Sequence, residues 1–171
     1  MATEAPAIAG EMEVLRYQSR LIQQVLRINT EGVTHEESLR RPEPAGNCLN
    51  WVVGHLVWVY CNVLRELGQE PPLPAQELAR YARGAAPLTD AGEARDLGEL
   101  LAAWDVASER VRAGLAGVSP EALDQPAPNS PTGNPDETIR TLLSTVLFHQ
   151  GYHVGQTGVL RRLLGKPGAI K

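Results

Sequence analysis

Two histidines one helical turn apart, His149 and His153, are the residues of this chain whose types and spacing point most directly to chemistry. They belong to the segment Phe148-His149-Gln150-Gly151-Tyr152-His153, and side chains four residues apart on an α-helix share one face. Two imidazoles on one face can chelate a metal ion. The spacing alone is weak support, because four histidines produce such a pair by chance often enough that its surroundings must decide.

A third histidine, His55, lies in the apolar segment Trp51-Val52-Val53-Gly54-His55-Leu56-Val57-Trp58, where an ordinary core helix needs no imidazole. Three histidine ligands are typical of catalytic metal sites, which keep a coordination position open for water or substrate. The alternative is a set of core histidines whose ring nitrogens are satisfied by backbone carbonyls and by Gln156. His35 lies in a loop segment and is interpreted as a solvated residue.

The heptad-like pattern of the last helical segment places these polar residues among core positions. We expect the inward positions to be Ile139, Leu142, Val146, His149, His153, Gln156, Leu160 and Leu163. An unsatisfied buried polar group costs about 1 to 3 kcal/mol, so three in succession require partners such as a metal ion, water or each other. His55 is likewise a polar residue at an expected core position, between Val52 and Val59. It can face His149 and His153 if the two helices pack as neighbours. The pattern therefore favours a metal site.

Apolar periodicity and capping signals predict long helices over residues 11–30, 47–67, 96–116 and 134–164. Thr34-His35-Glu36-Glu37 predicts a capping box for a short helical turn, and residues 69–95 read as a long crossover with a helical piece near residues 75–81. Asn134-Pro135-Asp136-Glu137 is expected to open the last helix, which Gly165 ends. No segment shows convincing strand alternation.

The expected fold class is therefore all-α, a four-helix bundle with long crossover connections. We expect one domain over residues 1–171, with residues 1–10 frayed. A chain of 171 residues buries a core without a structural metal, so a metal ion here would serve function more than folding.

Composition argues against several classes of partner. The 16 basic and 20 acidic residues give a net charge of −4, and no basic cluster offers a track for nucleic acid. The most apolar stretch, residues 51–64, is shorter than the roughly 20 residues of a membrane span. Cys48 and Cys61 match no zinc or redox pattern, and no signal peptide is recognisable, so we expect a reduced, cytoplasmic protein.

Two short motifs together resemble a known family. His149-x-x-x-His153-x-Gly155-Gln156 is followed by Leu160-Arg161 and Gly165, and Asn47-x-x-x-Trp51-x-x-x-His55-Leu56 precedes it. In this order they resemble the DinB-like (DinB/YfiT-like) superfamily of metalloenzymes. The resemblance covers essentially the whole chain. It implies a four-helix bundle, often a homodimer, with a divalent metal ion held here by His55, His149 and His153.

The same resemblance suggests the chemistry, since related families transfer low-molecular-weight thiols or carry out thiol-dependent isomerisation. A metal ion bound by three neutral imidazoles acidifies a bound water or thiol. We therefore expect zinc or nickel, with iron or copper as alternatives, and a transferase that acts on a small molecule with a low-molecular-weight thiol. Gln156 is expected to orient a ligand histidine, water or substrate.

Two further functions stay open at this point. A metal-dependent hydrolase would use the same site but needs a general base, for which the sequence offers no obvious candidate. A noncatalytic, stress-associated metal-binding protein is the other alternative. Cys48 lies near a helix start that could lower its pKa, although a packed thiol is the simpler interpretation.

Overall fold

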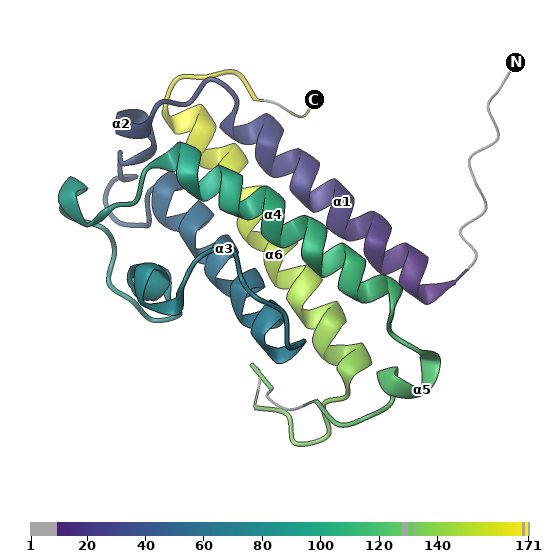
Figure 1. The fold of residues 1–171 in the computed structure, drawn as a ribbon. Coiled ribbons are helices and arrows are strands. Elements are labelled where there is room, and N and C mark those ends of the chain that lie inside the picture. Colours follow the sequence, from purple (N-terminus) through teal and green to yellow (C-terminus); the bar gives the residue numbers. More distant parts are fainter. Residues whose placement is uncertain (1–9, 128–129, 132, 169, 171) are drawn as a thin grey trace, which may run out of the picture.

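Four long helices form an all-α bundle in the computed structural model, which describes residues 10–127, 130–131, 133–168 and 170 (Figure 1). Residues 1–9, most of the segment expected to fray, lie outside the described residues. The elements are α1 (Glu11–Thr30), α2 (His35–Ser38), α3 (Leu49–Glu66), η1 (Ala75–Tyr81), η2 (Ala91–Glu93), α4 (Leu97–Ala116), α5 (Pro120–Leu123) and α6 (Ile139–Leu163). The predicted fold class is confirmed.

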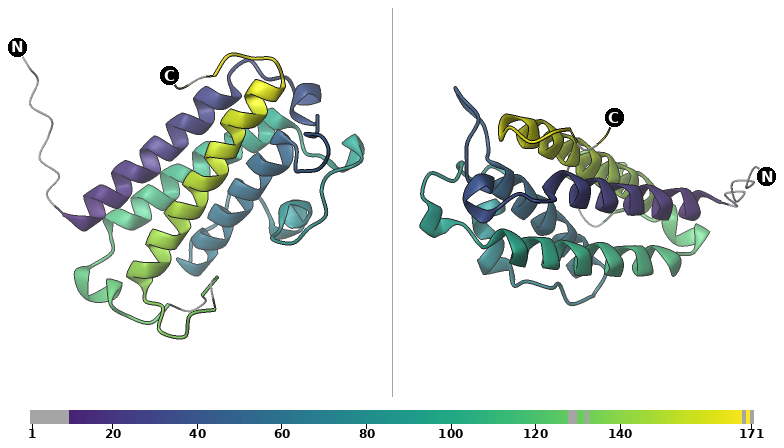
Figure 2. Two further views of the ribbon diagram at one scale, coloured as in Figure 1. Left: turned by 180° about the vertical axis from the view of Figure 1, so that it is seen from behind. Right: turned by 90° about the horizontal axis from the view of Figure 1, so that it is seen from above.

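The long helices pack in the cyclic order α1, α4, α3, α6 (Figure 2). Helices α1 and α6 run parallel, because Arg140 pairs with Glu11 at one end and Asn29 donates to Thr157 Oγ1 at 3.0 Å near the other. Helices α3 and α4 also run in one direction, so the chain between them must return along the bundle. The segment from Leu67 to Asp96, with η1 and η2, makes this predicted crossover.

The core is apolar and continuous across the four helices. Tyr60 of α3 stacks on Trp104 of α4, with ring centroids 4.9 Å apart and planes 2° from parallel. A buried side-chain amide joins α3 to α6. Gln150 Nε2 of α6 donates to the Leu56 carbonyl of α3 at 3.1 Å. This contact fixes α6 against α3 close to the three histidines. Among the described residues, no helix has the length and apolar character that crossing a membrane requires.

Several predicted boundaries are confirmed. Helix α1 spans Glu11–Thr30, Thr34 and Glu37 form the capping box of α2, and Asp96 accepts from the Glu99 amide at the start of α4. Gly68 and Gly165 both adopt a positive φ just beyond the ends of α3 and α6, as expected of left-handed helix stops.

The predicted start of the last helix is wrong by four residues, because the N-cap is Thr138 and not Asn134. Asn134 Oδ1 accepts from the Asp136 amide at 3.1 Å, so Asn134-Pro135-Asp136 closes a turn instead of a helix. The chain then pairs briefly with residues 125–127, and α6 begins at Ile139 with a capping box between Thr138 and Thr141. The second helix likewise begins one residue later than expected, with Cys48 in place of Asn47 at the N-cap.

The predicted inward positions of α6 are rotated from the observed ones. The buried residues are Leu143, Val146, Leu147, Gln150, Val154, Thr157 and Leu160, whereas Leu163 is 64% exposed. His149, His153 and Gln156 therefore lie beside the buried strip and are only partly buried. The prediction failed because Gly151, Gly155 and Gly158 weaken the apolar signal on this helix, and because Gln150 and Thr157 are core positions despite their polarity.

Candidate metal centre

His55, His149 and His153 converge between α3 and α6. One ring nitrogen from each can be chosen so that all three lie within 4.8 Å of one another. His55 Nε2 and His149 Nε2 are 3.3 Å apart, and the His149 and His153 ring centroids are 4.4 Å apart. His55 is buried, while the other two are partly exposed, so the cluster is closed on the side of α3 and reaches the surface on the side of α6.

The crossover sets the orientation of His55. Its Nδ1 lies 2.7 Å from the carbonyl oxygen of Tyr81, the last residue of η1. A carbonyl only accepts, so Nδ1 carries the proton and donates it. Nε2 of His55 is therefore left with its lone pair directed at the cluster, the form in which a neutral imidazole binds a metal ion.

Gly54 allows η1 to pack this closely against α3. A Cβ built on Gly54 would lie 2.2 Å from Tyr81 Cδ1, a separation that atoms cannot adopt. The Tyr81 hydroxyl donates to Asn50 Oδ1 at 3.0 Å and accepts from the Arg95 amide at 2.8 Å. Tyr81 is thus fixed at both ends, by its ring on Gly54 and by its hydroxyl, and its carbonyl is presented to His55.

Two indoles sandwich the His55 ring. Trp51 stacks on one side, with centroids 5.0 Å apart and planes 11° from parallel, and Trp58 on the other at 5.6 Å and 17°. They precede and follow His55 by about one helical turn, which puts all three rings on one face of α3. The stack fixes the plane of the imidazole and shields it from water.

The two histidines of α6 are held differently. His153 Nδ1 lies 2.8 Å from Gln156 Oε1, an amide oxygen that only accepts, so Nδ1 carries the proton and His153 Nε2 is free of one. His149 Nδ1 is buried and has no hydrogen-bond partner, and the same is true of Oε1 of the adjacent Gln150. His149 is therefore oriented by packing and by its contact with His55.

The three imidazoles are neutral at physiological pH. Burial, followed by the neighbouring His153 and His55 rings, lowers the pKa of His149 to about 4. Burial is also the main reason that the pKa of His55 and of His153 is below the usual histidine value. Near pH 7 these imidazoles can therefore bind a metal ion without first losing a proton.

The geometry fits a divalent ion. Two nitrogens bound at roughly 2.0 to 2.1 Å in a tetrahedral arrangement lie about 3.3 to 3.4 Å apart, and the observed His55–His149 separation is 3.3 Å. Within the described residues, no Asp, Glu or Cys side chain joins the cluster. Three neutral donors suit zinc, nickel, copper and iron alike.

Several residues of this region were not predicted from the sequence. Tyr81 and Arg83 come from the crossover, and Arg83 Nη1 donates to the Pro131 carbonyl at 2.8 Å. Glu137, expected in the first turn of the last helix, is instead buried just before it, with Oε2 unpartnered and Oε1 accepting from Thr145 at 3.4 Å. The contacts of Tyr81 and Arg83 join segments that are far apart in the chain, so no local pattern reveals them.

Cys48 does not join the site. It is fully buried, and burial raises the pKa of its thiol, in the opposite direction to the helix-end effect considered from the sequence. The interpretation as a packed thiol is therefore the better one.

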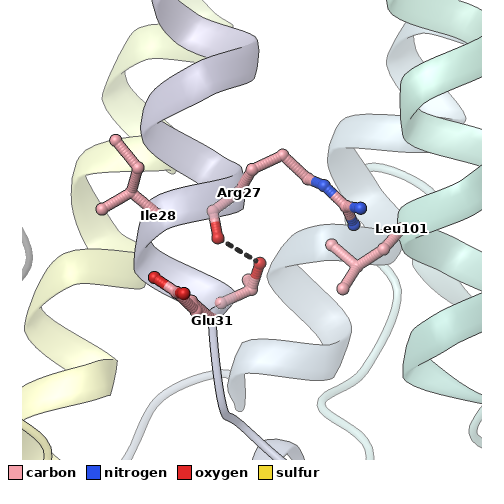
Figure 3. A pocket seen from close by; sticks show the side chains of 5 residues that line it. Arg27, Ile28, Glu31 and Leu101 are labelled. Carbon is pink, nitrogen blue, oxygen red and sulfur yellow. Dashed lines mark hydrogen bonds between the residues drawn. The ribbon is translucent and has the colours of Figure 1, made fainter.

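A separate surface hollow of about 380 Å³ lies between the end of α1 and α4 (Figure 3). It is lined by Arg27, Ile28 and Thr30 of α1, by Glu31 just after α1, and by Leu101 of α4. Arg27 pairs with Asp105 at 3.5 Å, and Thr30 Oγ1 donates to the Leu26 and Arg27 carbonyls at 2.9 and 3.2 Å. Arg27 and Thr30 thus have partners in the protein, whereas His149 Nδ1 of the histidine cluster has none.

Comparison with known proteins agrees with this architecture. A crystal structure of a conserved protein from Enterococcus faecalis is similar to this chain with a TM-score of 0.71 and 17% sequence identity, over 91% of this chain and 98% of that one. At that identity the likeness shows the fold alone. The search of curated proteins gave no match. The model of the DinB superfamily matches residues 18–157, a range that includes all three clustered histidines, so the chain belongs to the DinB superfamily.

Proposed function

We propose that the protein is a metal-dependent enzyme that transfers a low-molecular-weight thiol to an electrophilic small molecule, with His55, His149 and His153 as the metal ligands. The observation that supports this most is the convergence of three neutral imidazoles, one buried and two partly exposed. Three protein ligands and an open side are typical of catalytic metal sites, whereas structural zinc sites are closed by four. Zinc or nickel is the preferred ion, and iron or copper the alternative.

In this proposal each residue has a distinct task. The Tyr81 carbonyl and the two indoles hold His55, and Gln156 holds His153. Partners of this kind fix the tautomer and orientation of ligand histidines. Trp51 and Trp58 also exclude water from the α3 side, so a substrate approaches where His149 and His153 are partly exposed.

A divalent ion bound here would supply Lewis acidity, which lowers the pKa of a thiol. The overall reaction is balanced without a redox partner. A carbon–sulfur bond forms, the bond from carbon to the leaving group breaks with both electrons going to that group, and the thiol proton passes to solvent.

The experiment mixes metal-loaded protein with a panel of cellular thiols and a chlorobimane. We expect fluorescent thioether and release of chloride, at a rate above the uncatalysed one for at least one thiol. The His149→Ala/His153→Ala variant, with circular dichroism to confirm folding, is the control and should show only the uncatalysed rate. Equal rates with and without wild-type protein for every thiol would contradict the proposal.

The two alternatives have less support. A hydrolase needs a general base, and within the described residues no carboxylate joins the cluster. A noncatalytic metal-binding protein does not explain why the cluster is open on one side.

We also propose that the protein forms a homodimer through α1 and α6. Of the eleven exposed large apolar residues among those described, eight lie on these two adjacent helices. This α1–α6 face consists of Val14, Tyr17, Leu21, Ile28, Phe148, Tyr152, Val159 and Leu163. The first four repeat at coiled-coil spacing, and Gly151 and Gly155 leave open space above α6 for a close approach.

A two-fold axis perpendicular to the two helices would pair this face with itself in antiparallel fashion. That arrangement brings the acidic first turn of α1, with Glu11 and Glu13, toward the basic last turn of α6, with Arg161 and Arg162. Sedimentation equilibrium should give a dimer for the wild type and a monomer for Leu21→Glu/Val159→Glu. Val106→Glu, which changes an exposed apolar residue of α4, should remain dimeric; a monomeric wild type would contradict the proposal.

We also propose that the protein works in a reducing compartment, because of its two cysteines. Cys48 and Cys61 are both free and buried. Free thiols and thiol-dependent chemistry are compatible with a reducing environment such as the cytoplasm.

A further inference from the structure

Two buried polar atoms without partners belong to consecutive residues of α6, His149 Nδ1 and Gln150 Oε1. Their side chains reach consecutive residues of α3. His149 Nε2 lies 3.3 Å from His55 Nε2, and Gln150 Nε2 donates to the Leu56 carbonyl at 3.1 Å. The first contact leaves the δ nitrogen of His149 unused, and the second leaves the amide oxygen of Gln150 unused. Both unpartnered atoms therefore belong to neighbouring side chains at the histidine cluster.

The tautomer of His149 explains why neither atom has a partner. His55 donates its Nδ1 proton to the Tyr81 carbonyl, so His55 Nε2 can only accept. His149 must then donate from Nε2 across the 3.3 Å contact, which leaves a lone pair on its Nδ1. An amide oxygen also only accepts. His149 Nδ1 and Gln150 Oε1 are therefore both acceptors and cannot bond to each other in this tautomer.

Metal binding reverses the roles of the two ring nitrogens. A ligand imidazole uses a lone pair, so the proton of His149 must move from Nε2 to Nδ1 before Nε2 can bind beside His55. One proton leaves Nε2 for solvent and one arrives at Nδ1, so the ring neither gains nor loses a proton overall. The new donor at Nδ1 then needs an acceptor, and Gln150 Oε1 is the unpartnered acceptor on the adjacent residue.

His55 and His153 already show the arrangement that His149 lacks. Nδ1 of each ring lies against a carbonyl oxygen, at 2.7 Å from that of Tyr81 and at 2.8 Å from that of Gln156. In both rings the ε nitrogen is thereby left with its lone pair. A third oxygen that accepts from Nδ1 of His149 would make the three ligands equivalent.

We propose that Gln150 is a positioning residue of the metal centre, whose Oε1 accepts the Nδ1 proton of His149 when His149 Nε2 binds the metal ion. The inference rests on the metal site of the proposed function. It gives one buried amide two tasks, since Nε2 ties α6 to the Leu56 carbonyl of α3 while Oε1 orients a ligand.

Two substitutions separate these tasks. Gln150→Met has nearly the same length and loses both, whereas Gln150→Glu keeps an acceptor oxygen and loses the donor to Leu56. Both variants should be less stable in urea denaturation. Competition with a chromophoric chelator should show that Gln150→Met binds zinc about 10- to 100-fold more weakly than the wild type, while Gln150→Glu binds at least as tightly. Unchanged affinity in Gln150→Met, or equal weakening in both variants, would overturn the proposal.

Asn29→Leu is the matched control. Asn29 is another buried amide that donates to a backbone carbonyl of α6, that of Val154 at 3.2 Å, and its side chain does not contact the three histidines. This variant should lose stability and keep the zinc affinity of the wild type. A loss of affinity as large as that of Gln150→Met would overturn the proposal, because a general loosening of α6 would then explain both results.

A spectroscopic readout needs no substitution. Long-range proton–nitrogen correlation spectra of the wild type report which ring nitrogen of His149 carries the proton. We expect Nε2 in metal-free protein and Nδ1 after zinc is added, where exchange of this proton with water should be slower than in Gln150→Met. A proton that stays on Nε2 would overturn the proposal.

The failure of this inference differs from the failure of the proposed function. If zinc binds as described and no thiol is transferred, the transferase proposal fails and the role of Gln150 stands. If Gln150→Met binds zinc like the wild type, only the role of Gln150 is overturned. If the wild type binds no zinc, both are overturned.

Discussion

The histidine cluster between α3 and α6 and the hollow between α1 and α4 differ in what their polar groups do. The hollow has measurable volume, yet Arg27 is paired with Asp105 and Thr30 donates to the backbone of its own helix (Figure 3). In the cluster, His149 Nδ1 is buried without a partner, and imidazole nitrogens face one another at 3.3 Å. Unsatisfied groups that converge indicate a binding site more reliably than empty space does.

The largest expected effect is the loss of metal binding in His149→Ala/His153→Ala. Zinc at 100 times its dissociation constant stabilises a protein by about 2.7 kcal/mol, which should appear as a clear rise in the melting temperature of the wild type. The double variant should show no rise. Glu31→Gln, in the α1–α4 hollow, should keep the full rise in melting temperature. Loss of the rise in this variant would mean that zinc binding depends on the hollow as much as on the histidine cluster.

Gly54→Ala should damage the site through the crossover. The added Cβ would meet the Tyr81 ring at 2.2 Å, so η1 must move and the His55–Tyr81 hydrogen bond must lengthen. Overpacking of this kind costs about 1 to 3 kcal/mol, and zinc affinity should fall as well. Gly117→Ala, at the end of α4 and far from the cluster in the chain, is the matched control, because a Cβ there meets its nearest atom at an ordinary contact of 3.6 Å. Urea denaturation and zinc titration of both variants check this; unchanged values for Gly54→Ala would contradict the role of Tyr81.

Gln156→Ala should weaken zinc binding by roughly 10- to 100-fold, the effect typical of losing a partner that orients a ligand histidine. The reason is that His153 Nδ1 would lose the acceptor at 2.8 Å. Gln156→Glu keeps an acceptor oxygen and should retain most of the affinity. Competition with a chromophoric chelator measures both constants, and an Ala variant as tight as the wild type would show that Gln156 is only a packing residue.

The pH dependence of metal-free stability should be the mildest effect. The histidine pKa is 6.5 when unperturbed and about 4 for His149 in the folded protein, so between these values the unfolded chain binds more protons. Stability therefore rises with pH over this range, by at most about 1.4 kcal/mol per pH unit for each such histidine, and is lost as pH falls. Replacement of all three clustered histidines by Gln should flatten this profile in urea denaturation; an unchanged profile would contradict the role of their burial.

Local patterns predicted the helices because helix boundaries depend on nearby residues. The bounds of α1 and the capping box at Thr34 follow from periodicity and side-chain chemistry within a few positions. The last helix starts late because pairing with residues 125–127 competes with the local signal at Asn134. That pairing joins two separate segments of the chain, so a rule that uses only neighbouring residues cannot predict it.

The same distinction applies to the site. The spacing of His149 and His153 and the isolated position of His55 were sufficient to predict that the three imidazoles come together. Their surroundings were not predictable, since the Tyr81 carbonyl has no sequence signature and reaches His55 only through the path of the crossover. The burial of α6 was also misjudged, because three glycines and two buried polar residues obscure its apolar face.

Elemental analysis of purified protein after dialysis against zinc, beside the His149→Ala/His153→Ala variant treated identically, tests the metal centre most directly. We expect one zinc ion per wild-type chain and none in the folded variant. Equal metal content in the two proteins would contradict the assignment of the histidine cluster as a metal centre.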